Sequence, residues 1–465
     1  MSAPHQAAAR PSNPIPRAAV FFLVASLVSG LVHMVLTPPF QAPDEAAHFF
    51  RAWRVSEGRL DLRPGRERAW IDVPSGLLRA GSRLYGAPPF RAERPIAWDE
   101  LRRATRVPIG STRERVYVPN TLQYTFLPYV PQAAGIAMAR ASGASALGAL
   151  YAARLANLVV ASLLISWAIA RLPAYRWLTT AVALTPMAVA LRASVSADAL
   201  ALAAACLWVA TIAYAAFGAE ALRRRDVVAL TTAATLLCAT KAAYVPLLAL
   251  VLLVPRARWP SRRRARWAWA TVGASIVIVI TTWAIATARA VPALRVDAAV
   301  DPPRQAAHAL AHPLSFAGIV LRDYVVHALR YAAQLVGKLG WLDVPLPRVF
   351  VGGYLLLLAT LIALDGSPEL EVRASHRWLV GIAAAACLML VSASQYALWT
   401  PLGANWVEGV QGRHLLPIAV AAIWAFHWRR WAHRWPRAVP LTVMTSSVVA
   451  LLVAGRALLA HYFAG

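Results

Sequence analysis

Long apolar runs separated by short polar connections dominate this chain, and they predict helices that cross a membrane. The first run covers residues 18–36, close to the ~20 residues that a spanning helix needs. The 226–254 run is open to being two pieces around Lys241 and Pro246. From residue 121 onward the runs lie at 121–139, 148–170, 177–192, 196–218, 226–254, 267–291, 349–364, 376–398, 414–428 and 438–461. We therefore expect an all-α polytopic membrane protein with about 11–12 transmembrane helices.

The same pattern divides the chain into six segments. Only one of them is a long hydrophilic stretch, and it directly follows the first apolar run. We expect a cytoplasmic N-terminal tail at 1–17, a first transmembrane helix at 18–37, a large external loop at 38–119, transmembrane helices at 120–291, an external amphipathic segment at 292–348 and C-terminal transmembrane helices at 349–465.

The hydrophilic loop at 38–119 is rich in Arg, Pro and Gly. Within it Ala46–Gly58 has the spacing of an amphipathic helix that stops at the glycine, and the rest is typical of loops. A disordered surface loop is the simpler interpretation. Scattered aromatic residues, among them Trp53, Trp70 and Trp98, favour a small ordered subdomain that lies on the membrane face.

Composition excludes a water-soluble protein with a single core, since 59% of the residues are hydrophobic and the mean hydropathy is +0.53. The formal charge of +26 does not indicate nucleic-acid binding. The arginines lie mainly in short clusters between apolar runs, a pattern typical of topology control and of contact with anionic membrane lipids.

The arginine clusters predict which loops share a side of the membrane. Clusters at 256–266 and 429–434 indicate the cytoplasmic face. Counting outward from them places residues 292–348 and 399–413 on the external face, together with 38–119.

Arg10 and Arg17 precede the first helix and predict a cytoplasmic N-terminus, in the plasma (inner) membrane of a bacterial-type cell. The topology of the first half of the chain is harder to assign. If the cluster Arg223–Arg225 is cytoplasmic too, the number of crossings between residues 119 and 226 must be odd, whereas the apolar runs there predict an even number. One of these segments is therefore re-entrant, or two of them count as one.

Candidate chemistry begins where the first apolar run ends, in the stretch from Pro38 to Phe50. Asp44, Glu45 and His48 lie at the mouth of a membrane helix, where charged groups are costly unless they face water or one another, so a functional site is the first hypothesis. His48 shares a helix face with both carboxylates and could orient one of them. The alternative is structural, with Asp44 as a helix N-cap and Glu45 in the first helical turn.

Four more polar residues interrupt apolar sequence or stand at its edge. Asp198 and Lys241 lie within apolar segments, and either a functional role or an ion pair between them would explain both. Arg413 and His414 stand at the external mouth of a span, where a guanidinium could hold a phosphate through two parallel hydrogen bonds. Snorkelling at the headgroup level is the structural alternative for that pair.

Five motifs, in order over about residues 18–430, resemble the DUF2142 family of multi-pass membrane proteins, which is in turn similar to the GT-C glycosyltransferases. His414 departs from the family pattern, which usually has an aromatic residue there. The motifs are Pro43-Asp44-Glu45 with His48-Phe49, Ser196-Ala197-Asp198, Lys241 with Tyr244 and Pro246, Gly340-Trp341-Leu342-Asp343, and Gly409-Val410-Gln411-Gly412-Arg413-His414-Leu415-Leu416-Pro417.

The resemblance implies a GT-C-like enzyme that transfers a sugar, with inversion, from a polyprenyl-phosphate donor to a glycan, lipid or protein acceptor on the external face. Asp44 would be the base, with Glu45 as its partner or substitute, and a base contributes about 10²–10⁴-fold to rate. Arg413 and Lys241 would bind the donor phosphate. The remaining residues expected to line the site are His48, Asp198, Trp341, Asp343, Gln411 and His414.

No cofactor is expected. A divalent metal at Asp44, Glu45 and His48 is the minority interpretation, because the oxygen ligands are sparse. Two functions from other classes stay open: a transporter or flippase of lipid-linked glycans, and a non-catalytic assembly protein of the cell envelope. A transporter would more often show internal repeats, and the two halves of this chain show no self-similarity.

Overall fold

The computed structural model describes residues 15–60, 69–121, 124–218, 221–288, 299–432 and 434–463. These residues are helical almost throughout, which confirms the all-α class. The helices are α1 (Arg17–Leu36), α2 (Glu45–Ser56), α3 (Ser75–Tyr85), α4 (Trp98–Ala104), α5 (Val130–Ala141), α6 (Ala146–Arg171), α7 (Arg176–Ala183), α8 (Pro186–Arg192), α9 (Ala197–Phe217), α10 (Arg224–Thr240), α11 (Arg262–Ala288), α12 (Pro302–Ala311), α13 (Pro313–Val326), α14 (Ala328–Gly337), α15 (Arg348–Leu364), α16 (Ala374–Trp399), α17 (Leu416–Ala422) and α18 (Ala438–Tyr462).

Short 3₁₀ helices and two small two-stranded sheets complete the elements. The paired strands are β1 (Trp70–Pro74) with β2 (Arg113–Tyr117) and β3 (Lys338–Leu339) with β4 (Val344–Pro345), both pairs antiparallel. The 3₁₀ helices are η2 (Pro119–Thr121), η3 (Leu127–Tyr129), η4 (Ala242–Leu253), η5 (Arg256–Arg258), η6 (Gly412–Leu415) and η7 (Ile423–Phe426).

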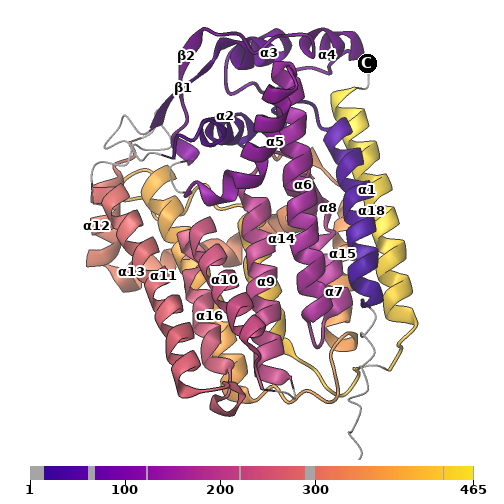
Figure 1. The fold of residues 1–465 in the computed structure, drawn as a ribbon, viewed down its shortest axis with the longest axis vertical. Helices are drawn as coiled ribbons and strands as arrows, with labels where there is room; N and C mark the ends of the chain where they lie inside the picture. Colours follow the sequence, from indigo (N-terminus) through magenta and orange to yellow (C-terminus); the bar gives the residue numbers. More distant parts are fainter. Residues whose placement is uncertain are drawn as a thin grey trace, which may run out of the picture.

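The long helices run side by side, and a small subdomain covers one end of the bundle (Figure 1). Among the described residues α1, α6, α9, α16 and α18 are long and apolar enough to cross a membrane. Shorter apolar helical stretches lie at Ala242–Leu253, Arg348–Leu364 and Gly412–Phe426. We call the covered end the subdomain end, and the opposite end, where η5 begins the 256–266 cluster, the arginine end.

The subdomain consists of α2, β1, α3, α4 and β2, so the prediction of loops after Gly58 was wrong and that of an ordered subdomain is supported. The helix predicted over Ala46–Gly58 is α2, and Gly58 follows it with a φ of +73°. A separate apolar core, in which Phe49 and Trp53 of α2 are buried with Leu77 of α3, holds these elements together. This core continues onto α5 and α6, which fixes the subdomain to the bundle.

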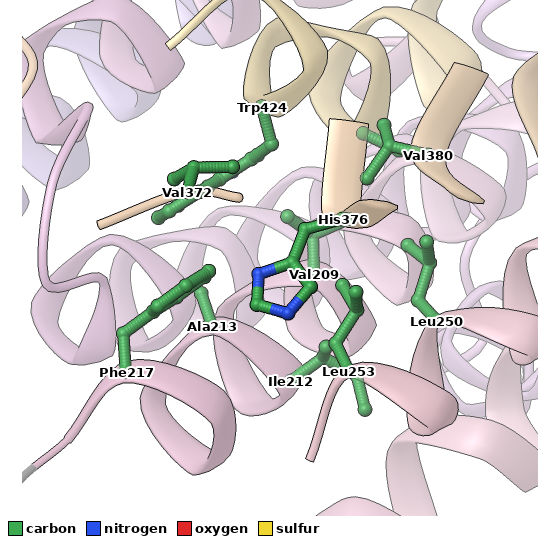
Figure 2. A pocket seen from close by; sticks show the side chains of 11 residues that line it. Val209, Ile212, Ala213, Phe217, Leu250, Leu253, Val372, His376, Val380 and Trp424 are labelled. Atoms are coloured by element: carbon green, nitrogen blue, oxygen red, sulfur yellow. The ribbon is translucent and has the colours of Figure 1, made fainter. Parts of the chain in front are cut away.

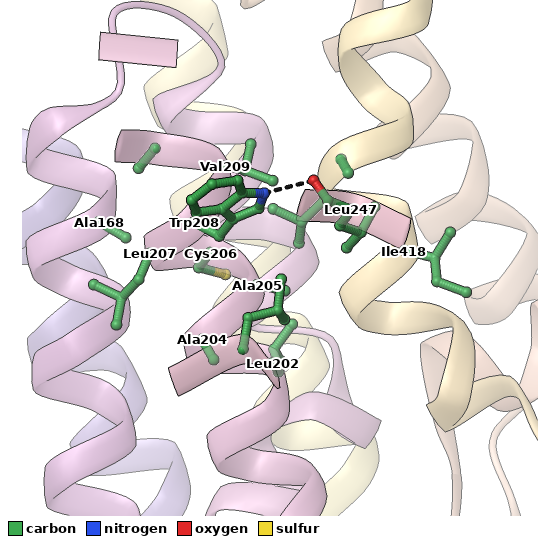
Figure 3. Close-up of a cluster of buried hydrophobic side chains, with 14 of the residues drawn as sticks. Ala168, Leu202, Ala204, Ala205, Cys206, Leu207, Trp208, Val209, Leu247 and Ile418 are labelled. Atoms are coloured by element: carbon green, nitrogen blue, oxygen red, sulfur yellow. Dashed lines mark hydrogen bonds between the residues drawn. The ribbon is translucent and has the colours of Figure 1, made fainter. Parts of the chain in front are cut away.

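The core of the bundle surrounds α9, which is buried along most of its length. Its many alanines allow neighbouring helices to approach closely, as small residues do in membrane bundles. Trp208 is fully buried, and its indole Nε1 donates to the backbone carbonyl of Leu247 at 2.7 Å (Figure 3). That bond ties α9 to the 3₁₀ helix η4.

Two predicted spans differ from the structure, and a third divides at a position that the sequence left open. The 121–139 run forms η2, η3 and α5, and the 12 residues of α5 extend only about 18 Å, short of the ~30 Å bilayer core. The 177–192 run breaks at Thr185 into α7 and α8, because Pro186 starts the second helix. The 226–254 run is indeed two pieces, with Lys241 as the extended residue between α10 and η4.

Because α5 is confined to the subdomain end, the number of membrane crossings between residues 119 and 226 is odd. The α6 helix runs to the arginine end, α7 with α8 returns, and α9 runs back again (Figure 1). At that end Arg258 donates to the carbonyls of Ala215 and Gly218, and Arg429 donates to the carbonyl of Pro368. Both arginine clusters therefore lie at the end opposite the subdomain, as the charge pattern predicted.

The predicted external segment at 292–348 forms α12, α13, α14 and the β3–β4 hairpin, apart from residues 292–298, which lie outside the described residues. Its helices expose large apolar side chains, including Leu314 at 88% and Leu329 at 85% exposure. Of the predicted cytoplasmic tail, residues 1–14 also lie outside the described part of the chain.

Single cysteines test which loops share a side. We expect cysteines placed at the exposed residues Ser82, Ala299 and Leu402 to react with an impermeant thiol reagent in intact cells, once the three native cysteines are replaced by alanine. A cysteine at exposed Ser261, at the arginine end, is the control and should react only after permeabilisation. Protection of Ala299 with labelling of Ser82 would contradict the shared face.

Candidate functional site

Asp44 occupies the junction between the subdomain and the bundle. It precedes α2 with a φ of +60°, a left-handed conformation that Asp tolerates better than most residues, and its side chain makes no capping hydrogen bond. One carboxylate oxygen accepts from the amide of Asn120 at 2.8 Å, and the other accepts from Arg413 at 2.6 Å. The side chain therefore links the subdomain to the bundle instead of capping its helix.

Four charged side chains alternate in sign at this junction. Arg413 lies between two carboxylates, because its Nε is 3.6 Å from Asp198 while its Nη2 contacts Asp44. The Lys241 ammonium lies 3.8 Å from the other oxygen of Asp198. We call Asp44, Arg413, Asp198 and Lys241 the four-charge row. Its formal charges sum to zero, and Asp44, at 26% side-chain exposure, is its most accessible member.

The members of the row come from four separate elements. Asp198 is in the first turn of α9, where the helix dipole favours an anion, and Ser196 caps that helix. Lys241 stands at the break between α10 and η4, and Arg413 is in η6. The predicted ion pair between Asp198 and Lys241 is thus present, as one part of a larger arrangement.

Aromatic and imidazole groups surround the row. His48 Nδ1 lies 2.8 Å from the Tyr129 hydroxyl, so its ring is held by a tyrosine and not by a carboxylate. The Tyr124 hydroxyl donates to Asp198 at 3.0 Å. His414 is buried next to Arg413, and its backbone carbonyl accepts from the Tyr244 hydroxyl. These rings shield the charges from water, which strengthens interactions among them.

Burial and the neighbouring charges set the ionisation of Asp44 and His48, which lie outside the membrane-spanning helices. Burial alone raises the pKa of Asp44, but the charge of Arg413 and the hydrogen bonds from Arg413 and Asn120 outweigh it and hold the pKa below its ordinary value. Burial lowers the pKa of His48 to about 4. At neutral pH Asp44 is therefore ionised and His48 is neutral.

The Gln411–His414 segment carries polar atoms that have no hydrogen-bond partner among the described residues. They are Gln411 Oε1, Arg413 Nε and His414 Nδ1, and all three atoms are buried. Buried polar atoms without a hydrogen bond are costly and rare in proteins, so three within four residues make this segment a candidate ligand site.

Two glycines set the path of this segment. Gly409 has a φ of +85° and leaves no room for a Cβ beside the Gln395 side chain. Gly412 lies against α14, where a Cβ would be 2.4 Å from the Tyr331 carbonyl, and its amide donates to Gln334 Oε1 at 2.8 Å. The close approach to α14 fixes the backbone that presents Arg413.

Glu45 is adjacent to Asp44 in sequence but belongs to a different contact set. Its carboxylate is fully buried and receives both sides of the Arg154 guanidinium, at 2.7 and 2.6 Å. The backbone amides of Phe40 and Val195 donate to the same oxygens. The remaining donors of Arg154 bind backbone carbonyls at the end of α1, those of Met34, Thr37 and Pro38. The Glu45–Arg154 pair therefore joins α2, α6 and the end of α1 at the subdomain end. Each Glu45 oxygen already accepts two hydrogen bonds, so Glu45 has no acceptor left for the four-charge row.

Trp341 and Asp343, the other predicted lining residues, lie beside the loop that follows α1. The Trp341 indole donates to the carbonyl of Phe40 at 3.0 Å, and Asp343 faces Arg91 of the subdomain at 3.4 Å. Neither has a hydrogen bond or ion pair with the four-charge row in the described part of the chain.

Sequence reasoning missed several residues at this junction. Asn120, Tyr124 and Tyr129 are neutral, and nothing in their sequence context marks them. Arg154 did carry a signal, since it is a charge inside the predicted 148–170 span, like Asp198 and Lys241 in theirs.

The donor set at the junction favours an anion over a metal. Within the described residues no group of three or more His, Cys, Asp or Glu side chains is arranged to hold a metal ion. Both carboxylates of the four-charge row already face a cation, whereas Arg413 Nε, 3.6 Å from Asp198, is a donor that makes no hydrogen bond. A site without metal therefore stays our prediction.

A small apolar pocket at the arginine end is a weaker candidate. It lies among α9, η4, α16 and η7, with the ring of Phe217 stacked on Trp424 and the His376 imidazole pointing inward (Figure 2). No carboxylate, arginine or lysine lines it. A lone imidazole among apolar side chains lacks the second group that acid–base or transfer chemistry needs.

Comparison with known proteins bears on the family. No curated protein and no solved structure matches this chain. The model of one protein family, described as "Predicted membrane protein (DUF2142)", matches residues 27–422, which include all four members of the four-charge row. This chain belongs to the DUF2142 family of predicted membrane proteins.

Proposed function

We propose that this protein is a membrane glycosyltransferase that moves a sugar from a polyprenyl-phosphate donor to an acceptor at the subdomain end, with inversion and with Asp44 as the base. The observation that carries the proposal is the position of Arg413, whose Nη2 contacts the Asp44 carboxylate while its buried Nε makes no hydrogen bond. The combination offers donors for an anionic leaving group next to an acceptor for a proton.

The reaction needs one base and no covalent intermediate. Asp44 takes the proton of the acceptor hydroxyl as the hydroxyl oxygen bonds to the anomeric carbon. The bond from that carbon to the phosphate oxygen breaks, and the electron pair stays on the lipid phosphate. Arg413 and Lys241 stabilise the charge on the phosphate, Arg413 through the fork of its guanidinium.

Donor binding would prepare the base. In the structure Arg413 holds Asp44 at a low pKa, which keeps it ionised but makes it a weak proton acceptor. A phosphate that binds Arg413 competes for the guanidinium and neutralises its charge, so the pKa of Asp44 moves back toward its ordinary range. Proton abstraction is then coupled to the presence of the donor.

The helices α13 and α14 offer a route for the lipid tail. Leu321 and Leu329 are 68% and 85% exposed, and the same helix pair exposes Arg322 and Arg330, which suit the headgroup level. Its one acidic residue, Asp323, is buried against Tyr331. Because α14 contacts Gly412 directly, a chain lying on this surface would reach the Arg413 segment from the bilayer.

Consumption of donor by the purified protein tests this function. In liposomes supplied with a radiolabelled polyprenyl-phosphate sugar and extracts of envelope glycans, lipids or proteins, we expect loss of lipid-linked label and its gain by one acceptor class. A flippase would move the intact donor between leaflets without cleaving it, and an assembly protein would do neither, so either outcome would overturn the proposal.

Arg413→Lys tests the role of the guanidinium. Lysine keeps the charge but cannot make two parallel hydrogen bonds to a phosphate, so we expect donor turnover to fall by about 10-fold or more. The measurement is initial rate against donor concentration in membranes normalised to protein level. Arg83→Lys, at an exposed position of α3, is the matched control. Equal rates for Arg413→Lys and the parent protein would remove Arg413 from phosphate binding.

A further inference from the structure

A groove on the outer surface of the bundle runs along α18. Its volume is about 780 Å³, within the range of small-molecule sites. It lies where α18 passes α1 and approaches α4 near the C-terminus (Figure 1). The groove is lined by Val32, Trp98, Leu451, Leu452, Gly455, Arg456, Leu459, Ala460 and Phe463. None of these residues belongs to the four-charge row, so the groove is a separate feature.

The walls of the groove are apolar and its upper end is aromatic. Leu452 and Leu459 are 67% and 43% exposed, and Gly455 hollows the floor because the nearest atom to a Cβ there would be 3.6 Å away, on Leu36. At the subdomain end Trp98 of α4 stacks on Phe463, with ring centroids 4.2 Å apart and planes within 6°. Tryptophan in this place is typical of the membrane–water interface.

Arg456 is the one charged residue that lines this groove. It is exposed and has no hydrogen bond or ion pair with any described residue. It lies six residues before Tyr462, the last residue of α18, or about 9 Å along the helix. From there a guanidinium reaches the headgroup level while its methylenes stay against apolar surface.

We propose that this groove binds an anionic phospholipid, with an acyl chain along α18 and the phosphate on Arg456. From Leu451 to Phe463 the groove extends about 18 Å, close to the ~15 Å of hydrocarbon in one leaflet. An unpaired guanidinium above an apolar channel complements a phosphate above an acyl chain. A dimer formed through this face with two-fold symmetry would instead bring the Arg456 cations of the two copies together, which is unfavourable.

Native mass spectrometry of the full-length protein, released from detergent and titrated with phosphatidylglycerol or phosphatidylcholine, tests this site. We expect one phosphatidylglycerol to bind before any phosphatidylcholine. Arg456→Gln should weaken phosphatidylglycerol binding about tenfold, the effect of losing a charge-assisted hydrogen bond. Ala460→Trp, at an exposed position inside the groove, should weaken both lipids, because the indole fills the channel.

Arg348→Gln is the matched control, since Arg348 is an exposed arginine outside the groove, and it should bind both lipids as the parent does. Elution as a single species and an unchanged melting temperature establish that each variant is folded. Unchanged phosphatidylglycerol binding by Arg456→Gln overturns the proposal. So does a parent protein that carries no lipid in this groove, a polyprenyl phosphate as its tightest lipid, or a dimer that Ala460→Trp dissociates.

Discussion

Asp44→Asn is expected to give a folded, membrane-inserted protein whose sugar transfer falls by about 10²-fold or more. The amide is close to the carboxylate in size but cannot take a proton from an acceptor hydroxyl. Its oxygen can still accept from Arg413, and Arg413 keeps a second carboxylate, Asp198, at 3.6 Å. The loss of stability should therefore stay near the ~1–3 kcal/mol of one hydrogen bond to a charged group.

Transfer from a polyprenyl-phosphate donor in membranes, normalised to protein abundance, measures this effect. Asp99→Asn is the control. It is the same chemical change in the same subdomain, at a side chain that is 71% exposed. It should leave both abundance and transfer unchanged. Wild-type transfer by Asp44→Asn at wild-type abundance would remove the proposed base, and the transferase mechanism with it.

The charged members of the site were predictable from sequence, because a charge within or beside an apolar run has a free-energy cost that the sequence pattern shows. Asp198 and Lys241 interrupt apolar runs, and a charge in such a place requires a partner or a function. Asp44 and Arg413 stand at the mouths of apolar runs. The sequence could not show that all four lie in one row, since that depends on how four helix ends meet.

Neutral residues at the same junction were not predictable. Asn120 and Tyr124 follow the subdomain in a stretch where polar side chains are common, so neither residue stands out in the sequence. Their bonds to Asp44 and Asp198 appear only once the subdomain is folded over the helix ends. The apparent equivalence of Asp44 and Glu45 failed for a related reason, because successive residues at a helix start point in different directions.

The limits of the span predictions are also physical. A hydropathy window averages over residues and cannot separate α7 from α8 at Pro186, where the mean stays apolar on both sides. Nor can it distinguish a buried helix of 12 residues, such as α5, from part of a longer span. In the second half, where runs are bounded by arginine clusters and proline, α16 and α18 lie within two residues of their predicted bounds.

Glu45→Gln is expected to destabilise the protein by about 3–5 kcal/mol, because it leaves the Arg154 cation buried without an anion. Both side chains are 0% exposed, so water cannot compensate. Arg154 itself holds three carbonyls at the end of α1, so its loss would loosen the loop that leads to Asp44. The expected result is low abundance and early aggregation on heating, not a stable protein that fails to transfer sugar.

A heating series followed by size-exclusion chromatography in detergent measures this loss. Glu100→Gln is the matched control: the side chains of Glu100 and its partner Arg94 are 28% and 65% exposed, so this variant should melt with the parent. Glu45→Gln combined with Arg154→Gln should cost less than the sum of the two single changes, because the second removes the uncompensated charge left by the first. A Glu45→Gln protein that melts with the parent but does not transfer sugar would instead place Glu45 in the chemistry, as the partner of Asp44 that the sequence first indicated.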